Sequence, residues 1–478
     1  MHAVVWFKRD LRWHDHAAWH AALESGMPIM LLFIVEPELV NHPTYSHRHW
    51  WFQFESIREI QTQFSHLNLK LNVLQGSVTK IFDDLLCHYG PFVLFSHEET
   101  GIGVTYERDR AVNRFAKSNQ LMWREFPQFA VQRGRKNRKG WDDDWDRFMN
   151  QKQLVLNVES GTYVRVSNEI RQKYKVTLHP QVKQGNFQVP GRLEALRVLH
   201  SFVHDRYKRY SRSISKPLES QHYCSRLSPY LAWGNLSLRE VVQFVAMGYR
   251  KTKNPNFQAA LSRLHWHCHF IQKLESDPAM EFVNQNKAYN TIRTELNEAY
   301  FALFTQGNTG FPLIDACICC LKETGYLNFR MRAMLVSFWT HHLFQPWQPL
   351  AVWMAALFLD FEPGIHFAQF QMQAGTVGYH TIRIYNPVKQ AEEHDPEAVF
   401  IKKWVPELAQ LPNHFAREPW TMTAMEEMFY QFQNGADYPN RMIDLENAAR
   451  RARDVLHTIK ASSAAKGLAT EIRKIHVK

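Results

Sequence analysis

The run Ile29–Val35, IMLLFIV, is apolar without a break. A strand buried on both faces of a parallel sheet has this pattern, whereas a strand with one wet face alternates apolar and polar residues. Ala3–Phe7, AVVWF, has the same character, and the helix-forming stretch 17–25 between the two runs is closed by Gly26 and Pro28. We therefore expect two strands of one parallel sheet with a helix between them.

Two further strand candidates lie outward along the chain, at 70–74 and 92–96, and helical patterns at 51–64 and 78–88 precede them. Strands that alternate with helices predict a doubly wound parallel sheet with helices on both faces, here over residues 1–130. No GxGxxG follows the first strand, so the standard dinucleotide fingerprint is absent. A ligand of this α/β domain should lie at the carboxyl edge of the sheet.

The remainder of the chain divides into a connector and a helical domain. Residues 131–191 are charged and rich in Pro and Gly, which is typical of a long link between domains. Residues 192–478 show helical periodicity almost throughout, with Asn, Asp, Pro and Gly at the expected ends. The helices that we expect there are 193–210, 238–247, 256–274, 296–304, 312–323, 329–343, 350–359 and 443–459.

Composition restricts the kind of protein. The formal charge of +11 and a pI near 9.2 favour a polyanionic partner, nucleic acid before a membrane surface. Aromatic residues are plentiful, with 15 Trp, 17 Tyr and 32 Phe, which suits stacking on bases or on a flavin. Three of the six cysteines, Cys317, Cys319 and Cys320, crowd into one helical turn, which fits reduced thiols better than a disulfide framework. Neither a signal peptide nor a membrane span is apparent. We expect a cytoplasmic monomer with reduced thiols and without a metal.

The stretch Asp360–Pro387, DFEPGIHFAQFQMQAGTVGYHTIRIYNP, is the strongest candidate for a ligand wall. Its aromatic and amide residues suit a flat ring, and a few polar groups would fix the orientation of that ring. The ionisable side chains in it are Asp360, Glu362, His366, His380 and Arg383. The alternative is a buried helix end that is followed by a loop and a strand-like run.

Three other motifs each have a structural alternative. Cys224–Ser228, CSRLS, offers hydroxyls, a guanidinium and backbone N–H groups that suit a pyrophosphate, although such loops are common. The basic stripe 206–212, with interleaved tyrosines, fits phosphate contact or a solvated helix face. In His265–His269, HWHCH, only the two end histidines share a helix face. No further residues at a recognisable spacing could complete a zinc site, so a helix that lines a pocket is favoured over a zinc site.

The order of five motifs resembles the photolyase/cryptochrome flavoprotein family over nearly the whole chain. The matching stretches are Val5–Arg12 followed by Asp15, Cys224–Gly234, Gln306–Asp315, Gly325–Arg332, and Arg383–Pro387 with Gln390, Asp395, Pro396 and Trp404–Leu408. No single motif is specific, and their order carries the resemblance. It implies an N-terminal α/β antenna domain, which holds a folate or a deazaflavin in some members, and a C-terminal helical domain that holds bent FAD.

The resemblance also assigns roles to residues by position. It implies that FAD contacts Tyr207, Cys224, Ser225, Arg226, Leu227, Ser228, His267, Arg332, Asp360, Phe361, Glu362 and His366. It implies that damaged DNA contacts Arg209, Arg212, Arg263, Trp266, Arg330 and Lys389. The residues expected to act in catalysis are Trp266, Arg263 and His366, the last of which aligns with the residue that faces flavin N5.

Several positions depart from the family pattern. Arg263 stands where repair enzymes carry a dimer-binding Glu, so Glu275 or Gln371 would have to supply that contact. The electron-hopping tryptophans align with Phe370, Trp347 and Phe304, and phenylalanine is much harder to oxidise than tryptophan. Trp347 is thus the one electron-transfer candidate. Phe329 and Ala333 replace the His pair of the (6-4) branch, which argues against (6-4) repair.

These features predict blue-light repair of cyclobutane pyrimidine dimers in DNA by electron transfer from reduced FAD. The chain looks most like a short bacterial branch of cyclobutane-dimer photolyases that prefers single-stranded DNA. The alternative is a cryptochrome-type light receptor without repair, which Arg263 favours and the interrupted tryptophan route disfavours. A third hypothesis is a flavin- and DNA-binding protein without catalysis, or a folate- or deazaflavin-binding relic.

Overall fold

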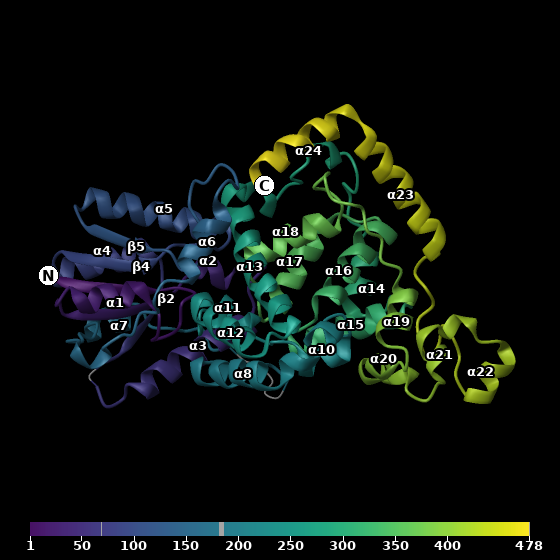
Figure 1. Ribbon diagram of the computed structural model, residues 1–478, viewed down its shortest axis with the longest axis horizontal. Helices are drawn as coiled ribbons and strands as arrows, with labels where there is room; N and C mark the ends of the chain where they lie inside the picture. The colour runs from purple at the N-terminus through teal and green to yellow at the C-terminus, as the bar shows by residue number, and fades with distance from the viewer. Residues whose placement is uncertain (68, 181–185, 478) are drawn as a thin grey trace.

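The N-terminal part of the computed structural model, which describes residues 1–67, 69–180 and 186–477, is a five-stranded parallel sheet (Figure 1). The strand order is β3-β2-β1-β4-β5, with β1 at the centre. Val5 of β1 pairs with Leu31 of β2 on one side and Phe95 of β4 on the other. The strands are β1 (His2–Phe7), β2 (Ile29–Val35), β3 (Leu71–Gln75), β4 (Phe92–His97) and β5 (Met122–Phe126).

Helices cover both faces of this sheet, which confirms the predicted doubly wound α/β fold. β2 is buried along its whole length, as its uninterrupted apolar sequence indicates. Sequence analysis did not predict β5, MWREF, because this edge strand is half-exposed and carries two charged residues. The helices of this part are α1 (Ala17–Glu24), α2 (Pro37–Val40), α3 (His47–Gln63), α4 (Val78–Tyr89) and α5 (Gly103–Ser118).

The connector returns to the sheet before it enters the helical part. The backbone N–H of Ile29 donates to the Thr162 carbonyl at 2.7 Å, and Val164 N–H donates to the Ile29 carbonyl at 2.8 Å. The connector contains α6 (Trp141–Met149), the short 3₁₀ turn Val158–Ser160 and α7 (Asn168–Lys173). Residues 181–185 of the predicted link lie outside the described residues.

The second part is helical, as predicted, and its longest helix is α13. Pro255 begins α13 after the Asn254 side chain caps it, and the helix continues to Ser276. The helices are α8 (Arg192–His204), α9 (Tyr210–Ser213), α10 (Pro217–Tyr223), α11 (Ser228–Ala232), α12 (Leu238–Thr252), α13 (Pro255–Ser276), α14 (Glu298–Gln306), α15 (Pro312–Thr324), α16 (Phe329–Ser337), α17 (Trp347–Leu357), α18 (Pro363–Gln373), α19 (Pro387–His394), α20 (Val399–Trp404), α21 (Asn413–Arg417), α22 (Ala424–Tyr430), α23 (Leu445–Ala461) and α24 (Ser463–His476).

In three places the structure differs in detail from the elements that the sequence suggests. The helix predicted over 193–210 breaks at Asp205, so Arg206–Arg209 form a separate 3₁₀ turn. The segment 329–343 changes from α16 to a π-helical turn at Phe338–His342. Residues 381–386, which could have formed a strand, are an irregular loop after α18.

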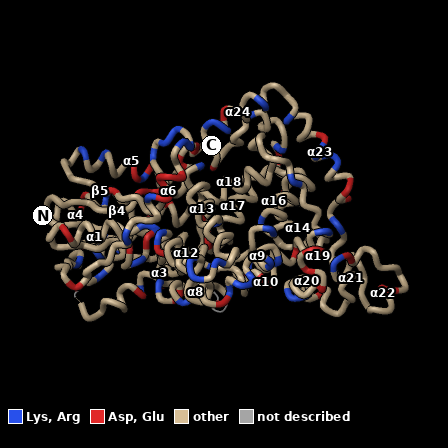
Figure 2. The backbone as a smooth tube through the Cα atoms, viewed as in Figure 1, with Lys and Arg blue, Asp and Glu red and all other residues tan. Residues whose placement is uncertain are grey.

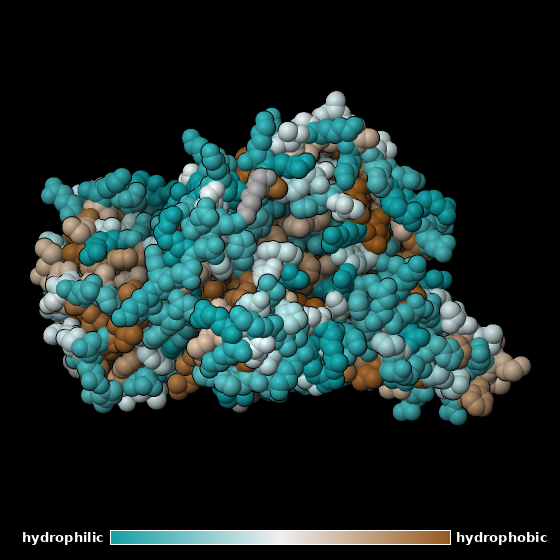
Figure 3. All heavy atoms as spheres, viewed as in Figure 1, coloured by the Kyte–Doolittle hydropathy of each residue, from teal (hydrophilic) through white to brown (hydrophobic). Residues whose placement is uncertain are grey.

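The centre of the helical part is the contact between α13 and α18. Gly364 permits this approach, because a Cβ at that position would lie 2.5 Å from the Ile271 Cα. On the face shown in Figure 3 most of the surface is hydrophilic, and apolar atoms show in separate groups at the left end, near the middle and toward the right of the view. Among the described residues, no helix is both long and apolar enough to cross a bilayer.

Candidate flavin and nucleic-acid site

The loop Cys224–Ser228 lies between α10 and α11 and is held from behind by Arg206. The Arg206 guanidinium donates to the Cys224 carbonyl, and to the Ser225 carbonyl at 3.2 Å. Arg226 adopts φ 58°, in the left-handed region, and its guanidinium lies 3.5 Å from the centre of the Tyr326 ring. Arg226 Nη1 is buried without a hydrogen-bond partner among the described residues. The loop thus presents a fixed cation with donor capacity to spare, which suits a phosphate.

Arg332 and Asp360 form an ion pair, which the sequence alone could not establish. Arg332 Nη2 donates to both carboxylate oxygens of Asp360, at 2.8 and 3.0 Å. Burial would raise the pKa of Asp360, but Arg332 and a hydrogen bond from Ser228 outweigh it and lower the pKa. Arg226 acts on the same carboxyl. The pair therefore lies beside the loop Cys224–Ser228 and stays ionised at neutral pH.

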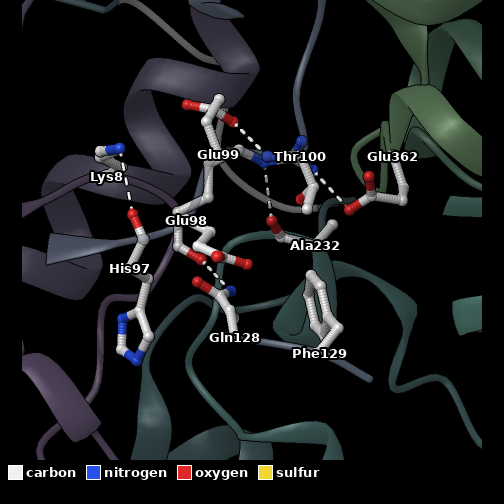
Figure 4. Close-up of a pocket in the computed structure, with 10 residues that line it drawn as sticks. Lys8, His97, Glu98, Glu99, Thr100, Gln128, Phe129, Ala232 and Glu362 are labelled. Atoms are coloured by element: carbon white, nitrogen blue, oxygen red, sulfur yellow. Dashed lines mark hydrogen bonds and ion pairs between the residues drawn. The ribbon is translucent and has the colours of Figure 1, made fainter. Parts of the chain in front are cut away.

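Glu362, at the N-cap of α18, is bound by an arginine from the sheet domain. Arg9 Nη2 donates to Glu362 Oε2 and to the Phe361 carbonyl, both at 2.9 Å. Burial raises the pKa of Glu362 to about 7, although Arg9 opposes this shift. Glu362 Oε1 and Arg9 Nη1 are both buried without a partner in the described chain. Both residues line a small pocket between the two parts of the molecule, which Lys8, Gln128 and Phe129 also line (Figure 4).

His366 lies one turn further along α18 and is neutral. Burial lowers its pKa to about 4. Its Nε2 is 2.8 Å from the Ala351 carbonyl, so Nε2 carries the proton and Nδ1 remains an acceptor. The ring packs against Phe361 and Phe370, with ring centres 5.3 and 4.7 Å away. Phe361 itself is a core residue that offers only its carbonyl.

Trp266 and Arg263 form an exposed pair on α13. The Trp266 side chain is 45% exposed, which is unusual for so large a ring. The Arg263 guanidinium lies 4.3 Å from the centre of the Trp266 ring. The neighbouring His267 is buried, and burial with the nearby Arg9 lowers its pKa to about 3. α13 thus places a stacking surface outward and a neutral imidazole inward.

The predicted DNA-binding cations mostly face solvent. Arg209, Arg212 and Lys389 are exposed, and Arg330 is half-buried over the Tyr385 ring at 5.5 Å. Lys and Arg are spread over the helical part and recur along α23 and α24 (Figure 2). This distribution is that of a surface for a polyanion.

Tyr207 and Trp347, two of the predicted site residues, pack against other side chains of the protein. Tyr207 stacks on Phe257, with ring centres 4.1 Å apart, so its ring face is covered on one side. Trp347 is buried, and its indole N–H donates to Asn284 Oδ1 at 2.8 Å. Phe304 lies between two other indoles, Trp339 at 5.3 Å and Trp353 at 6.3 Å. Oxidisable rings are therefore present near the positions where the predicted route is interrupted.

The carboxyl edge of the sheet holds an ion network where we expected a second chromophore. Arg108 pairs with Glu36 at 2.6 Å and also with Glu99, and Lys8 pairs with Asp109 at 2.9 Å. Burial raises the pKa of Glu36 to about 7 despite the pairing with Arg108. These charged side chains pair with one another at the edge of the sheet. An antenna chromophore at this edge remains a prediction.

A buried Asp–His–His group lies at the same edge. His97 Nδ1 and His16 Nε2 lie 2.6 and 3.0 Å from Asp10 Oδ2. His16 Nδ1 accepts the Trp19 backbone N–H, so its proton is on Nε2, the nitrogen that a metal ion would need. Both histidines can therefore share a proton with the Asp10 carboxylate.

The structure also shows what the sequence did not reveal. Arg9 belongs to the opening motif, but nothing in the sequence joins it to Glu362, 353 positions away. Arg206 was part of the basic stripe, and its role in holding the loop Cys224–Ser228 depends on tertiary contact. In both cases the only signal was an arginine within a recognised motif.

The unpartnered polar atoms test whether these residues fit FAD. Arg226 Nη1, His267 Nδ1, Arg9 Nη1 and Glu362 Oε1 are all buried and lack partners within the described chain. A dinucleotide with phosphates, ribityl hydroxyls and ring nitrogens offers both donors and acceptors to such atoms. The residues therefore fit the group. Fold and site together define a flavoprotein with a parallel-sheet domain and a helical FAD-binding domain.

Comparison with known proteins agrees. Residues 260–458 match the family described as FAD binding domain of DNA photolyase, and residues 3–132 match the family described as DNA photolyase. The chain belongs to the photolyase/cryptochrome flavoprotein family. A deoxyribodipyrimidine photo-lyase of Alkalihalophilus pseudofirmus is 22% identical over 94% of this chain and 96% of the relative. A cryptochrome DASH of Synechocystis is 24% identical over 95% and 97%.

A solved structure shares the fold. The crystal structure of a class III photolyase from Agrobacterium tumefaciens superposes with a TM-score of 0.83 at 22% identity, over 96% of this chain and 98% of the other. At this level of identity the likeness concerns the fold.

Proposed function

We propose that this protein is a light-driven lyase that splits cyclobutane pyrimidine dimers in DNA. The observation that supports this most is the arrangement of α13, which presents Trp266 outward while His267 and Glu362 lie behind it at the flavin-binding residues. The two linked pyrimidines of a dimer could stack on the indole only after they leave the duplex, which costs less for damaged or single-stranded DNA. The site thus suits a dimer that has been turned out of its strand.

The residues of this chain then have distinct tasks. Arg226, Arg332 and Asp360 would hold the phosphate and ribityl portions of FAD, while Glu362 and His366 would line the ring. When bound and reduced, FAD supplies the electron that splits the dimer after absorption of blue light. The buried phenylalanines around His366 exclude water from this region.

Arg263 would recognise the dimer differently from an acid. A carboxylate accepts hydrogen bonds, whereas a guanidinium only donates them, so Arg263 suits the carbonyl oxygens of a dimer or a flanking phosphate. Its cation would also stabilise extra negative charge on the dimer. Glu275, one alternative acid, is occupied, because the Tyr106 hydroxyl donates to Glu275 Oε2 at 2.5 Å. Gln371 is occupied as well, since its amide donates to the Val283 carbonyl at 2.6 Å.

The second candidate is a blue-light receptor without repair. The lack of an acid at Arg263 favours it, and relatives named cryptochrome stand beside those named photo-lyase. A repair assay separates the two. Reduced protein with FAD is illuminated with oligonucleotides that carry one thymine dimer, in single- and double-stranded form. A lyase removes the dimer in the light and leaves it in the dark, faster in the single strand, whereas a receptor leaves it in both.

A further inference from the structure

Two cations and a histidine lie buried where three distant segments meet. Arg138 belongs to the connector before α6, Lys273 to the last turns of α13, and His476 to the end of α24. Their exposed fractions are only 3%, 2% and 1%. In Figure 1 the C-terminal end of α24 comes down beside α13. Buried lysine and arginine are rare unless something compensates their charge.

The hydrogen bonds of this group leave donors unused. Arg138 Nη2 donates to the His269 carbonyl at 3.0 Å, but Arg138 Nε and Nη1 have no partner among residues that the structure describes. Lys273 Nζ, which carries three protons, donates to the Tyr379 hydroxyl at 3.0 Å. His476 Nδ1 is buried as well and has no hydrogen-bond partner in the described part of the chain. The oxygens that accept these hydrogen bonds are neutral. The other neighbours of the two cations are aromatic rings, with Arg138 5.0 Å from the centre of the Trp141 ring and Lys273 5.6 Å from that of Tyr379.

The charges that act on the group are mainly positive. Burial, and then Arg138, lowers the pKa of Lys273 to about 8. Burial followed by the same two cations lowers the pKa of His476 to about 3. The nearby Arg135 is already paired with Asp144 at 2.6 Å. At the border of the group, Asp142 Oδ1 lies 3.2 Å from His265 Nε2.

We propose that Arg138, Lys273 and His476 form a binding site for a small phosphate-bearing anion. Arginine and lysine are the usual phosphate donors, and a neutral imidazole can donate one further hydrogen bond. An anion would satisfy the unused donors and compensate two buried cations at once. The depth of the group favours a compact phosphate over the backbone of a DNA strand. The site uses other residues than the flavin and dimer site and does not depend on the proposed function.

Inorganic phosphate is the probe that tests this site. Equilibrium dialysis of the full-length holoprotein with labelled phosphate, at constant ionic strength, should show saturable binding of one phosphate per chain. Lys273→Met should weaken it about tenfold or more, because a charged hydrogen bond is lost. Lys322→Met, which removes an exposed lysine at the end of α15, should leave it unchanged.

Stability gives an independent readout. Phosphate should raise the thermal midpoint of the wild type, because it binds the folded state, and should not raise that of Lys273→Met. In chloride alone the Lys273→Met protein should unfold at a higher temperature than the wild type, since an apolar side chain replaces an uncompensated cation. Absence of saturable phosphate binding, or equal binding by Lys273→Met, would overturn the proposal. So would a site that binds undamaged oligonucleotide but no free phosphate and is lost in Lys273→Met.

Discussion

Arg9 Nη2 and Glu362 Oε2 lie 2.9 Å apart and join the loop after the first strand to the start of α18. Arg9 also donates to the carbonyl of Ala232, the last residue of α11, at 3.0 Å. One guanidinium therefore ties the sheet domain to two segments of the flavin-binding part. The position of Glu362, which we expect to contact FAD, therefore depends on a residue in the other domain.

This ion pair predicts that losing Arg9 alone destabilises the protein more than losing both charges together. Arg9→Met should lower the free energy of unfolding by about 3–5 kcal/mol, because it leaves a buried carboxylate unpaired. Arg9→Met combined with Glu362→Gln should recover much of that loss, since no buried charge remains. Urea unfolding of the four apoproteins in a double-mutant cycle measures the coupling. Additive losses would show that the pair is not coupled.

The raised pKa of Glu362 predicts how stability depends on pH. The folded carboxyl titrates near pH 7 and the unfolded one near 4.5, so the folded state holds the proton more tightly. The contribution of this group to stability is full below pH 4.5 and is lost as the pH rises toward 7. Glu362→Gln should flatten the fall in unfolding free energy of the apoprotein between pH 5 and pH 8. A slope equal to that of the wild type would contradict this assignment.

Asp360 should be required for cofactor affinity. Asp360→Asn removes the charge that holds Arg332 beside the loop Cys224–Ser228, and we expect FAD to bind at least about tenfold more weakly. Asp454→Asn, on the exposed side of α23, changes the same group far from the site and should have no effect. Fluorescence titration of each apoprotein with FAD measures the difference. Equal affinity of Asp360→Asn and the wild type would place the cofactor elsewhere.

Trp266 should carry much of the affinity for damaged DNA. Stacking of one base on an aromatic side chain contributes about 1–3 kcal/mol, so Trp266→Ala should weaken binding of dimer-containing oligonucleotides by about 5- to 150-fold. Affinity for FAD should persist, because the indole is exposed on the outer side of α13. Phe429→Ala, which removes a 76% exposed ring on the distant α22, serves as the control. Fluorescence anisotropy with labelled oligonucleotides would distinguish these outcomes.

Much of the fold follows from local sequence, whereas the site geometry depends on long-range packing. β2 and the long α13 could be predicted because their apolar patterns and caps are local. β5 could not be predicted, because this partly exposed edge strand lacks the uninterrupted apolar sequence of a buried strand. Motif order indicated Arg332 and Asp360 as cofactor contacts, but their ion pair, and that of Arg9 with Glu362, required knowledge of how distant segments pack.

The most direct test of the proposed chemistry is the number of dimers removed per absorbed photon. The protein with fully reduced FAD would be mixed without oxygen with an oligonucleotide that carries one thymine dimer and then exposed to counted blue-light flashes. The proposal predicts that dimers disappear in proportion to the photons absorbed, that none disappear in the dark, and that Trp266→Ala slows the loss at subsaturating DNA. Unchanged dimers after illumination, with reduced FAD and DNA both shown to be bound, would contradict it.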